Sequence, residues 1–123
     1  MQHQVIIDRV TKRLIEGAKN SETVFYEDIL ADASYGVVAE PGKPNEIGNV
    51  LREISRDEVL LGNPPLSAIC VRKEAGIPGP EFRSFLDPAE KMNEQQLKAM
   101  WQFIRDAVFD YYDKRRRKGS LQR

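Results

Sequence analysis

The chain has 123 residues, of which 41% are hydrophobic, 8% aromatic and 31% charged, and its formal net charge is zero. This composition indicates one folded domain with enough apolar side chains for a core, and it excludes an intrinsically disordered chain. No apolar run approaches the roughly 20 residues that a membrane-spanning helix needs. Charged residues throughout positions 1–20 leave no apolar segment typical of a signal peptide.

The sequence contains a single cysteine, Cys70, and a single histidine, His3. One cysteine forms no intrachain disulfide, and this favours a reducing, cytoplasmic compartment. Because His3 stands next to the start, catalytic Ser-His-Asp or Cys-His groups and histidine-based zinc sites lack a central residue. We therefore expect a protein that is not an enzyme and that uses no cofactor and no metal.

The zero net charge conceals an uneven distribution. Residues 114–123 contain no acid and six bases, which are Lys114, Arg115, Arg116, Arg117, Lys118 and Arg123. The 19 bases less these six leave 13 bases against 19 acids in residues 1–113, a net charge of −6. We expect one domain over 1–113 and a basic tail over 114–123. The tail either docks on phosphate or an acidic protein face, or forms a solvated helix end whose bases complement the helix dipole.

The first elements in chain order are predicted to be mainly helical. Residues 4–19 place Ile6, Val10 and Leu14 at i, i+4 and i+8, which predicts an amphipathic helix. Residues 23–26 are β-branched or aromatic and predict a short extended segment, followed by a brief helix to about Ser34. Residues 35–45 are rich in glycine, proline and asparagine, which predicts a loop.

A third helix is predicted to be capped by Asn45 and to end near Leu60. Its buried stripe is expected to consist of Ile47, Val50, Leu51 and Ile54. Residues 66–71 predict a strand, and the glycines and prolines of residues 73–80 predict a loop like the wing of a winged helix. Residues 81–86 are then expected to supply a short return strand.

A long final helix is predicted to begin near Asn93, with Gln96 three residues later completing a capping box. Its apolar stripe is expected to consist of Leu97, Met100, Trp101, Ile104, Val108 and Tyr111. Phe103 and Tyr112 lie off this stripe. We expect them to pack on the first helix or on a second copy of the chain, in a homodimer.

This order of elements predicts an α+β fold: a winged helix-turn-helix with an added N-terminal helix and a long C-terminal helix. The third helix then serves as the recognition helix, and Asn45, Asn49, Arg52 and Arg56 fall within about 60° on its polar side. Asparagine and arginine hydrogen-bond base edges and phosphates. A solvated or protein-binding face is the alternative, because the same helix carries four acids, which are Glu46, Glu53, Asp57 and Glu58.

Three segments carry a family resemblance: Val24-Phe25-Tyr26-Glu27-Asp28-Ile29, Ile47-Gly48-Asn49-Val50-Leu51 and Gly62-Asn63-Pro64-Pro65. Together they resemble the winged-helix active-site domain of alkylguanine-DNA methyltransferases over roughly residues 22–110. Where that family has Pro-Cys-His-Arg, this chain has Pro65-Leu66-Ser67-Ala68, and the family's arginine finger falls near Asn45. The resemblance implies the fold without alkyl transfer, and Cys70 is then a buried structural thiol.

A second resemblance covers Tyr26–Leu30, Ile47–Ile54 and Pro65–Gly79. These segments are similar to a group of small, largely uncharacterised bacterial proteins. Some such proteins occur as free-standing components of defence or immunity, and the group has no established activity.

The function we predict from the sequence is non-enzymatic binding of DNA or another nucleic acid. Asn45, Asn49, Arg52 and Arg56 are expected to contact the groove or backbone, Arg72 and Lys73 the phosphates beside the wing, and Lys114, Arg115, Arg116, Arg117 and Lys118 to add electrostatic attraction. One alternative is an immunity or antitoxin-like protein whose acidic body masks a basic toxin or other basic protein. Another is an alkyltransferase-like protein that senses lesions without repairing them. No membrane partner is expected.

Overall fold

The structure is a computed structural model that describes residues 3–37 and 46–113. In these ranges the chain is mainly α-helical, and its longest elements are three helices. In chain order the elements are α1 (His3–Lys19), β1 (Val24–Phe25), α2 (Tyr26–Ala31), the 3-10 turn η1 (Ala33–Tyr35), α3 (Glu46–Leu60), the 3-10 turn η2 (Leu66–Ile69), β2 (Cys70–Val71), α4 (Pro80–Leu86) and α5 (Glu94–Tyr112). None of the helices described here is long and apolar enough to cross a membrane.

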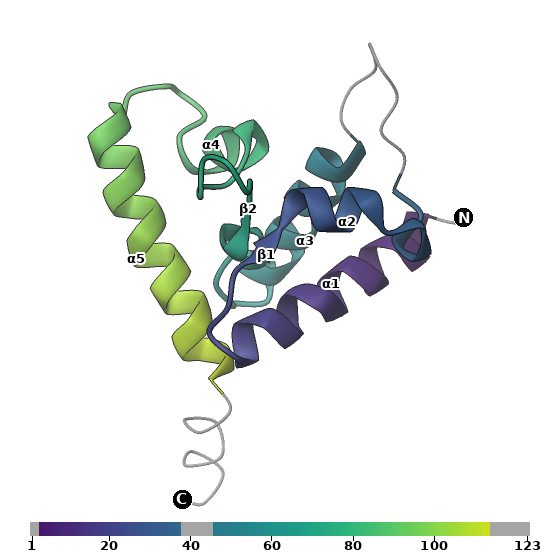
Figure 1. Ribbon diagram of the computed structural model, residues 1–123. Helices are drawn as coiled ribbons and strands as arrows, with labels where there is room; N and C mark the ends of the chain where they lie inside the picture. Colours follow the sequence, from purple (N-terminus) through teal and green to yellow (C-terminus); the bar gives the residue numbers. More distant parts are fainter. Residues whose placement is uncertain (1–2, 38–45, 114–123) are drawn as a thin grey trace, which may run out of the picture.

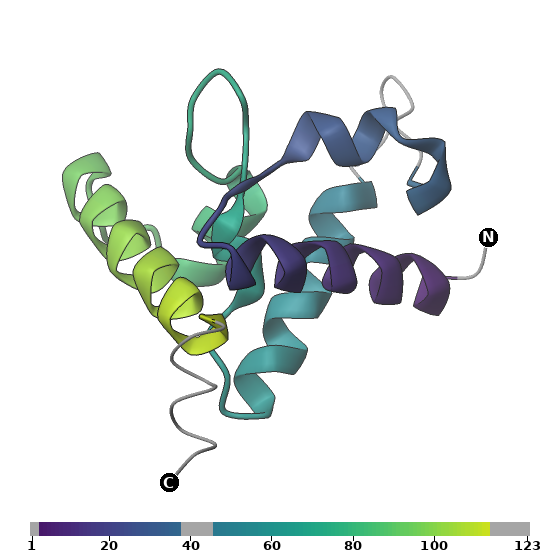
Figure 2. The same cartoon turned by 60° about the horizontal axis from the view of Figure 1, so that its bottom comes forward.

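The three long helices pack around η2, which lies at the centre of the core. Every residue of η2 is buried, because α1, α3 and α5 each contact it. The C-terminal ends of α1 and α5 lie side by side, and their N-terminal ends diverge (Figure 1, Figure 2). α4 fills part of the space between the diverging ends and contacts α3 (Figure 1).

α1 confirms the helix predicted for residues 4–19. Its apolar residues recur every three or four positions, and the helix buries the side chains of Ile6, Ile7, Val10, Leu14 and Ala18. The helix ends where the chain turns tightly: Asn20 and Glu22 both donate backbone hydrogen bonds to the Gly17 carbonyl. A Cβ at Gly17 would lie 2.8 Å from Val24 Cγ2, so this close approach of α1 to β1 requires glycine.

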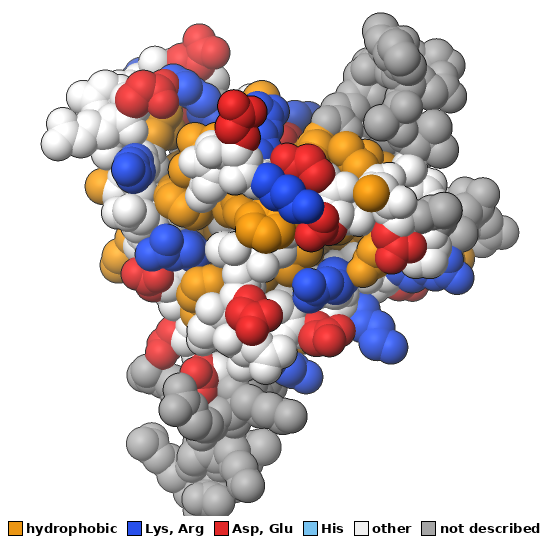
Figure 3. All heavy atoms as spheres, in the orientation of Figure 1, with side chains coloured by type: hydrophobic (Ala, Val, Ile, Leu, Met, Phe, Trp, Pro, Cys, Tyr) orange, Lys and Arg blue, Asp and Glu red, His pale blue; other side chains and the backbone are white. Residues whose placement is uncertain are grey.

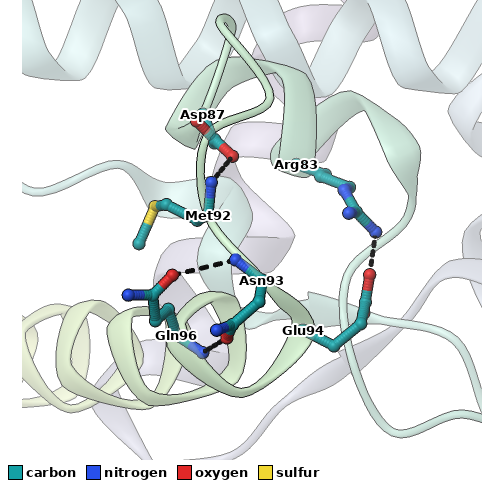
Figure 4. A network of polar contacts seen from close by, with 6 residues as sticks. All are labelled: Arg83, Asp87, Met92, Asn93, Glu94 and Gln96. Atoms are coloured by element: carbon teal, nitrogen blue, oxygen red, sulfur yellow. Dashed lines mark hydrogen bonds and ion pairs between the residues drawn. The ribbon is translucent and has the colours of Figure 1, made fainter.

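α5 begins with the predicted capping box (Figure 4). The Gln96 N–H donates to Asn93 Oδ1 at 2.8 Å, and the Asn93 N–H donates to Gln96 Oε1 at 2.9 Å. Further along the helix, the indole Nε1 of Trp101 donates a 2.8 Å hydrogen bond to the Ala68 carbonyl in η2. This bond joins the long C-terminal helix to the centre of the core.

The predicted winged helix is wrong, because the chain forms no β wing in the described ranges. Residues 66–69 form η2 instead of a strand, and only Cys70–Val71 are extended. β2 pairs in parallel with β1, with Val24 opposite Cys70 and Phe25 opposite Val71. This two-stranded parallel sheet is the only sheet in the described residues, so the fold belongs to the mainly-α class and not to the α+β class.

The predicted return strand over residues 81–86 is wrong, because these residues belong to helix α4. Pro80 occupies the first turn of α4, where its fixed φ suits a helix and its missing N–H is not needed. Phe82, Phe85 and Leu86 stand at i, i+3 and i+4, a helical spacing, and all three pack against the core. The loop from residue 72 to residue 79 therefore connects a short strand to a helix.

Candidate nucleic-acid interface

The outer side of α3 presents three of the residues predicted to contact nucleic acid. Asn49, Arg52 and Arg56 are all exposed, and their spacing of three and four residues places them on one side of the helix. The opposite side is in the core, where Ile47, Val50, Leu51 and Ile54 are each at most 2% exposed. The predicted division of this helix into a polar, exposed side and an apolar, buried side is confirmed. Asn45 lies outside the described residues.

Two acidic side chains of α3 are bound to other elements. Glu53 Oε2 lies 2.7 Å from Nε2 of His3, at the start of α1. Glu58 Oε2 accepts hydrogen bonds from Asn63 Nδ2 at 2.9 Å and from the Tyr112 hydroxyl at 3.0 Å. These contacts tie both carboxylates to groups outside α3.

Three of the arginines predicted to contact nucleic acid have no direct partner among the described residues. The guanidinium groups of Arg52, Arg56 and Arg72 make no ion pair or hydrogen bond within the ranges that the structure describes. Arg72 follows β2, and both it and Arg52 act electrostatically on the carboxyl of Glu81. Arg72, predicted for the wing, therefore lies near Glu81, and it lines the surface between the loop after β2, α4 and α5.

Glu81 is a buried carboxyl between α3 and α4, and the sequence analysis did not identify it. It is only 7% exposed, and its Oε1 has no hydrogen-bond partner. Burial raises the pKa of Glu81, while its own backbone N–H, Arg72, the Gly79 N–H and Arg52 act in the opposite direction. A Cβ at Gly79 would lie 2.6 Å from Glu81 Oε2, so any larger residue there would have to shift this carboxyl.

Lys73 is bound to α2 rather than free beside Arg72. Its Nζ lies 2.7 Å from Asp28 Oδ1 and 5.6 Å from the centroid of the Phe25 ring. Its backbone N–H donates to both carboxylate oxygens of Glu27 at 3.1 Å. The hydrogen bond to Asp28 raises the pKa of Lys73. Asp28 therefore competes with a phosphate for this half-exposed ammonium group.

The positions that correspond to the methyltransferase motif are buried. Leu66, at the acceptor-cysteine position, is 0% exposed, and Ser67 forms hydrogen bonds with Ser55. Cys70 is also 0% exposed, and burial raises the pKa of its thiol above the usual value. A thiol that is both buried and protonated is a poor nucleophile.

The predicted basic tail lies outside the described residues, so Lys114, Arg115, Arg116, Arg117 and Lys118 are not part of the interface described here. Across residues 3–37 and 46–113, no group of three or more His, Cys, Asp or Glu side chains could hold a metal ion. The comparisons with known proteins gave no match to a family model, to a curated protein or to a solved structure.

Proposed function

We propose that the chain is a non-enzymatic nucleic-acid-binding protein that contacts its ligand through the outer side of α3. The observation that carries this proposal is the charge arrangement of that helix. Arg52 and Arg56 are exposed and have no direct partner among the described residues, whereas Glu53 and Glu58 are held in contacts with other elements. Asp57 is the one acid of α3 whose described side chain is exposed and has no such contact, so the two arginines without a partner outnumber it.

The geometry of α3 suits a duplex groove. Its 15 residues form about four turns, and a helix with its side chains is roughly 10–12 Å across, close to the width of about 12 Å of the DNA major groove. Arg52 and Arg56 carry donors for phosphates and guanine edges, and Asn49 carries the amide that pairs with adenine.

The immunity or antitoxin-like alternative depends on the net charge of −6 for residues 1–113, and no specific contact favours it. On the face shown in Figure 3, acidic and basic side chains are interspersed and do not gather by sign. Glu27 and Asp28 are engaged by Lys73, as Glu53 is by His3. Fewer acids are therefore available to a basic partner than the sequence suggests.

Fluorescence anisotropy with labelled double-stranded and single-stranded DNA at low salt tests the proposal. Arg52→Gln/Arg56→Gln is expected to weaken duplex binding roughly tenfold to thirtyfold, because each lost charge contact is worth on the order of 1 kcal/mol. Lys12→Gln/Lys19→Gln removes the same charge from the exposed side of α1 and is the matched control. Failure of the wild type to bind either probe contradicts the proposal and favours a protein partner.

The basic tail is tested separately by deleting residues 114–123. We expect the deletion to weaken binding to all sequences alike, because phosphate contacts carry no sequence information. Arg52→Ala is expected instead to reduce the discrimination between sequences, provided that this arginine contacts a base edge. A deletion that changes sequence preference but not overall affinity contradicts the proposed role of the tail.

A further inference from the structure

A groove of about 610 Å³ lies between the loop that follows β2, helix α4 and the N-terminal half of α5. It is distinct from the outer side of α3, and Arg72 is the only residue proposed for nucleic-acid contact that lines it. Its volume falls within the range of about 300–1,000 Å³ that is typical of sites for small ligands. Figure 3 shows apolar side chains gathered between α5 and the centre of the molecule, with Lys and Arg side chains on both sides of them.

The floor of the groove is apolar and partly aromatic. Phe82, Leu97 and Trp101 line it and are each less than 10% exposed, and Leu86 is half-buried beside them. Ile77 stands at the edge with 40% of its surface exposed. Aromatic walls of this kind favour a flat ring, which stacks or packs edge-on against them.

The rim of the groove carries an excess of positive charge. Three basic residues line it, Arg72, Arg83 and Lys98, against the single acid Glu94, which leaves a net charge of +2. Arg83 Nη1 is paired with Glu94 Oε1 (Figure 4). Arg72 and Lys98 make no ion pair with any residue in the described ranges. Two cations on an apolar groove are therefore available to an anionic group.

The connection between α4 and α5 holds the groove in shape before any ligand binds (Figure 4). Asp87 accepts backbone hydrogen bonds from Lys91 at 3.0 Å and from Met92 at 2.8 Å. The Asn93 capping box then starts α5, and the Arg83–Glu94 ion pair links the two helices. A groove fixed in this way costs little conformational entropy when it is occupied.

We propose that this groove binds a small planar aromatic molecule that carries one anionic group. The ring would pack on Phe82 and Trp101, and the anion would lie between Arg72 and Lys98. The groove cannot favourably take residues 114–123 of the same chain, because that segment has six bases and no acid and the rim is itself positive. The size of the groove, its aromatic floor and its free cations all match this ligand class.

Trp101 is the only tryptophan of the chain, so its emission reports directly on the groove. The probe is anilinonaphthalene sulfonate, an aromatic anion, and phenylnaphthylamine is its neutral counterpart. We expect the sulfonate to bind saturably at one site per chain and to quench Trp101. Lys98→Gln is expected to weaken sulfonate binding about fivefold, since one charge at about 4 Å in water is worth about 1 kcal/mol. The neutral probe should bind this variant and the wild type alike.

Two further variants locate the site. Ala75→Phe places a large side chain at an exposed position of the lining and is expected to reduce binding of both probes. Arg56→Gln, on α3, is expected to change neither, although the proposed function requires it to weaken duplex binding. Failure of the groove proposal and failure of the nucleic-acid proposal are therefore distinguishable. Sulfonate binding that Ala75→Phe and Lys98→Gln leave unchanged overturns the groove proposal.

Competition experiments show whether the aromatic anion is a nucleotide or an aromatic acid. Displacement of the sulfonate by adenosine monophosphate supports a nucleotide ligand, and displacement by naphthoate alone supports an aromatic acid. Both results support the proposed ligand class. If neither compound competes, or if neutral naphthalene competes as well as naphthoate does, the anion has no specific role and the proposal is overturned.

Discussion

Ser55 Oγ donates a 2.5 Å hydrogen bond to Ser67 Oγ and accepts a 3.0 Å hydrogen bond from the Ser67 backbone N–H. Both residues are at most 1% exposed, so this pair joins α3 to η2 without help from solvent. It satisfies a backbone N–H that a regular strand would have paired with a neighbouring strand. The polar pair therefore helps to explain why residues 66–69 form a 3-10 turn within the core.

We expect Ser55→Ala to lower the free energy of unfolding by about 1–3 kcal/mol, because it leaves the buried Ser67 N–H without its acceptor. Urea unfolding followed by Trp101 fluorescence measures the change. Ser84→Ala removes a hydroxyl from an exposed position of α4 and is the control, expected within about 0.5 kcal/mol of the wild type. Equal stabilities of the two variants would show that the pair contributes nothing.

Trp101 makes the corresponding link from α5 to η2. Trp101→Phe keeps an aromatic ring but removes the N–H that donates to the Ala68 carbonyl. We expect a loss of about 1–3 kcal/mol from the orphaned carbonyl. Thermal unfolding monitored by far-UV circular dichroism measures it. Phe103→Leu, at a side chain that is 72% exposed on the same helix, should leave the midpoint unchanged.

Glu81 gives the stability a specific pH dependence. Burial raises its pKa in the folded chain above the usual value of 4.5. The folded state therefore binds the proton more tightly, and the stability that Glu81 contributes is complete below pH 4.5 and is lost as the pH rises through the folded pKa. We expect Glu81→Gln to become more stable relative to the wild type as the pH increases. Urea midpoints measured from pH 4 to pH 8 test this sign.

The matched control for this prediction is Glu74→Gln, which alters an exposed carboxyl in the loop after β2. Its stability relative to the wild type should stay constant over the same pH series. A relative stability of Glu81→Gln that falls with increasing pH would show that the carboxylate is favourably paired in the folded chain.

Cys70 is expected to accept no alkyl group. Its side chain is 0% exposed, and the pKa of the thiol is raised by burial first and by the nearby Glu81 carboxyl second. Incubation of the folded protein with alkylated DNA should leave the intact mass unchanged. Unfolding in urea should then make the same thiol reactive toward iodoacetamide. A mass increase at Cys70 in the folded protein contradicts this prediction.

The helices could be predicted from the sequence because their signals are local. In α1 and α3 the spacing of apolar residues predicts both the helix and its buried side. The Asn93–Gln96 capping box predicts the start of α5. Ile104 was predicted to belong to the core stripe, and it is half-buried at its edge. Tyr112, placed off the stripe, is buried and bonded to Glu58, whereas Phe103 is exposed.

The wing was mispredicted because its signal depends on tertiary contacts. The alternating side chains of residues 66–71 predict a strand. In the structure both sides of this segment are buried, so no face is left to solvent. The burial of Glu81 could not be predicted, because it depends on packing against α3 beside Gly48, which is distant in the sequence. The local signals for α4 are Pro80, which suits the first turn of a helix, and the i, i+3, i+4 spacing of Phe82, Phe85 and Leu86.

The most direct test of nucleic-acid binding through α3 is the salt dependence of duplex binding for three proteins: the wild type, Arg52→Gln/Arg56→Gln and Lys12→Gln/Lys19→Gln. Each phosphate contact contributes about 0.9 to the slope of log affinity against log salt concentration. We predict that the α3 variant has a slope shallower than that of the wild type by about 1.8. The control variant, with the same net charge, should keep the wild-type slope. Equal slopes for all three proteins would contradict nucleic-acid binding through α3.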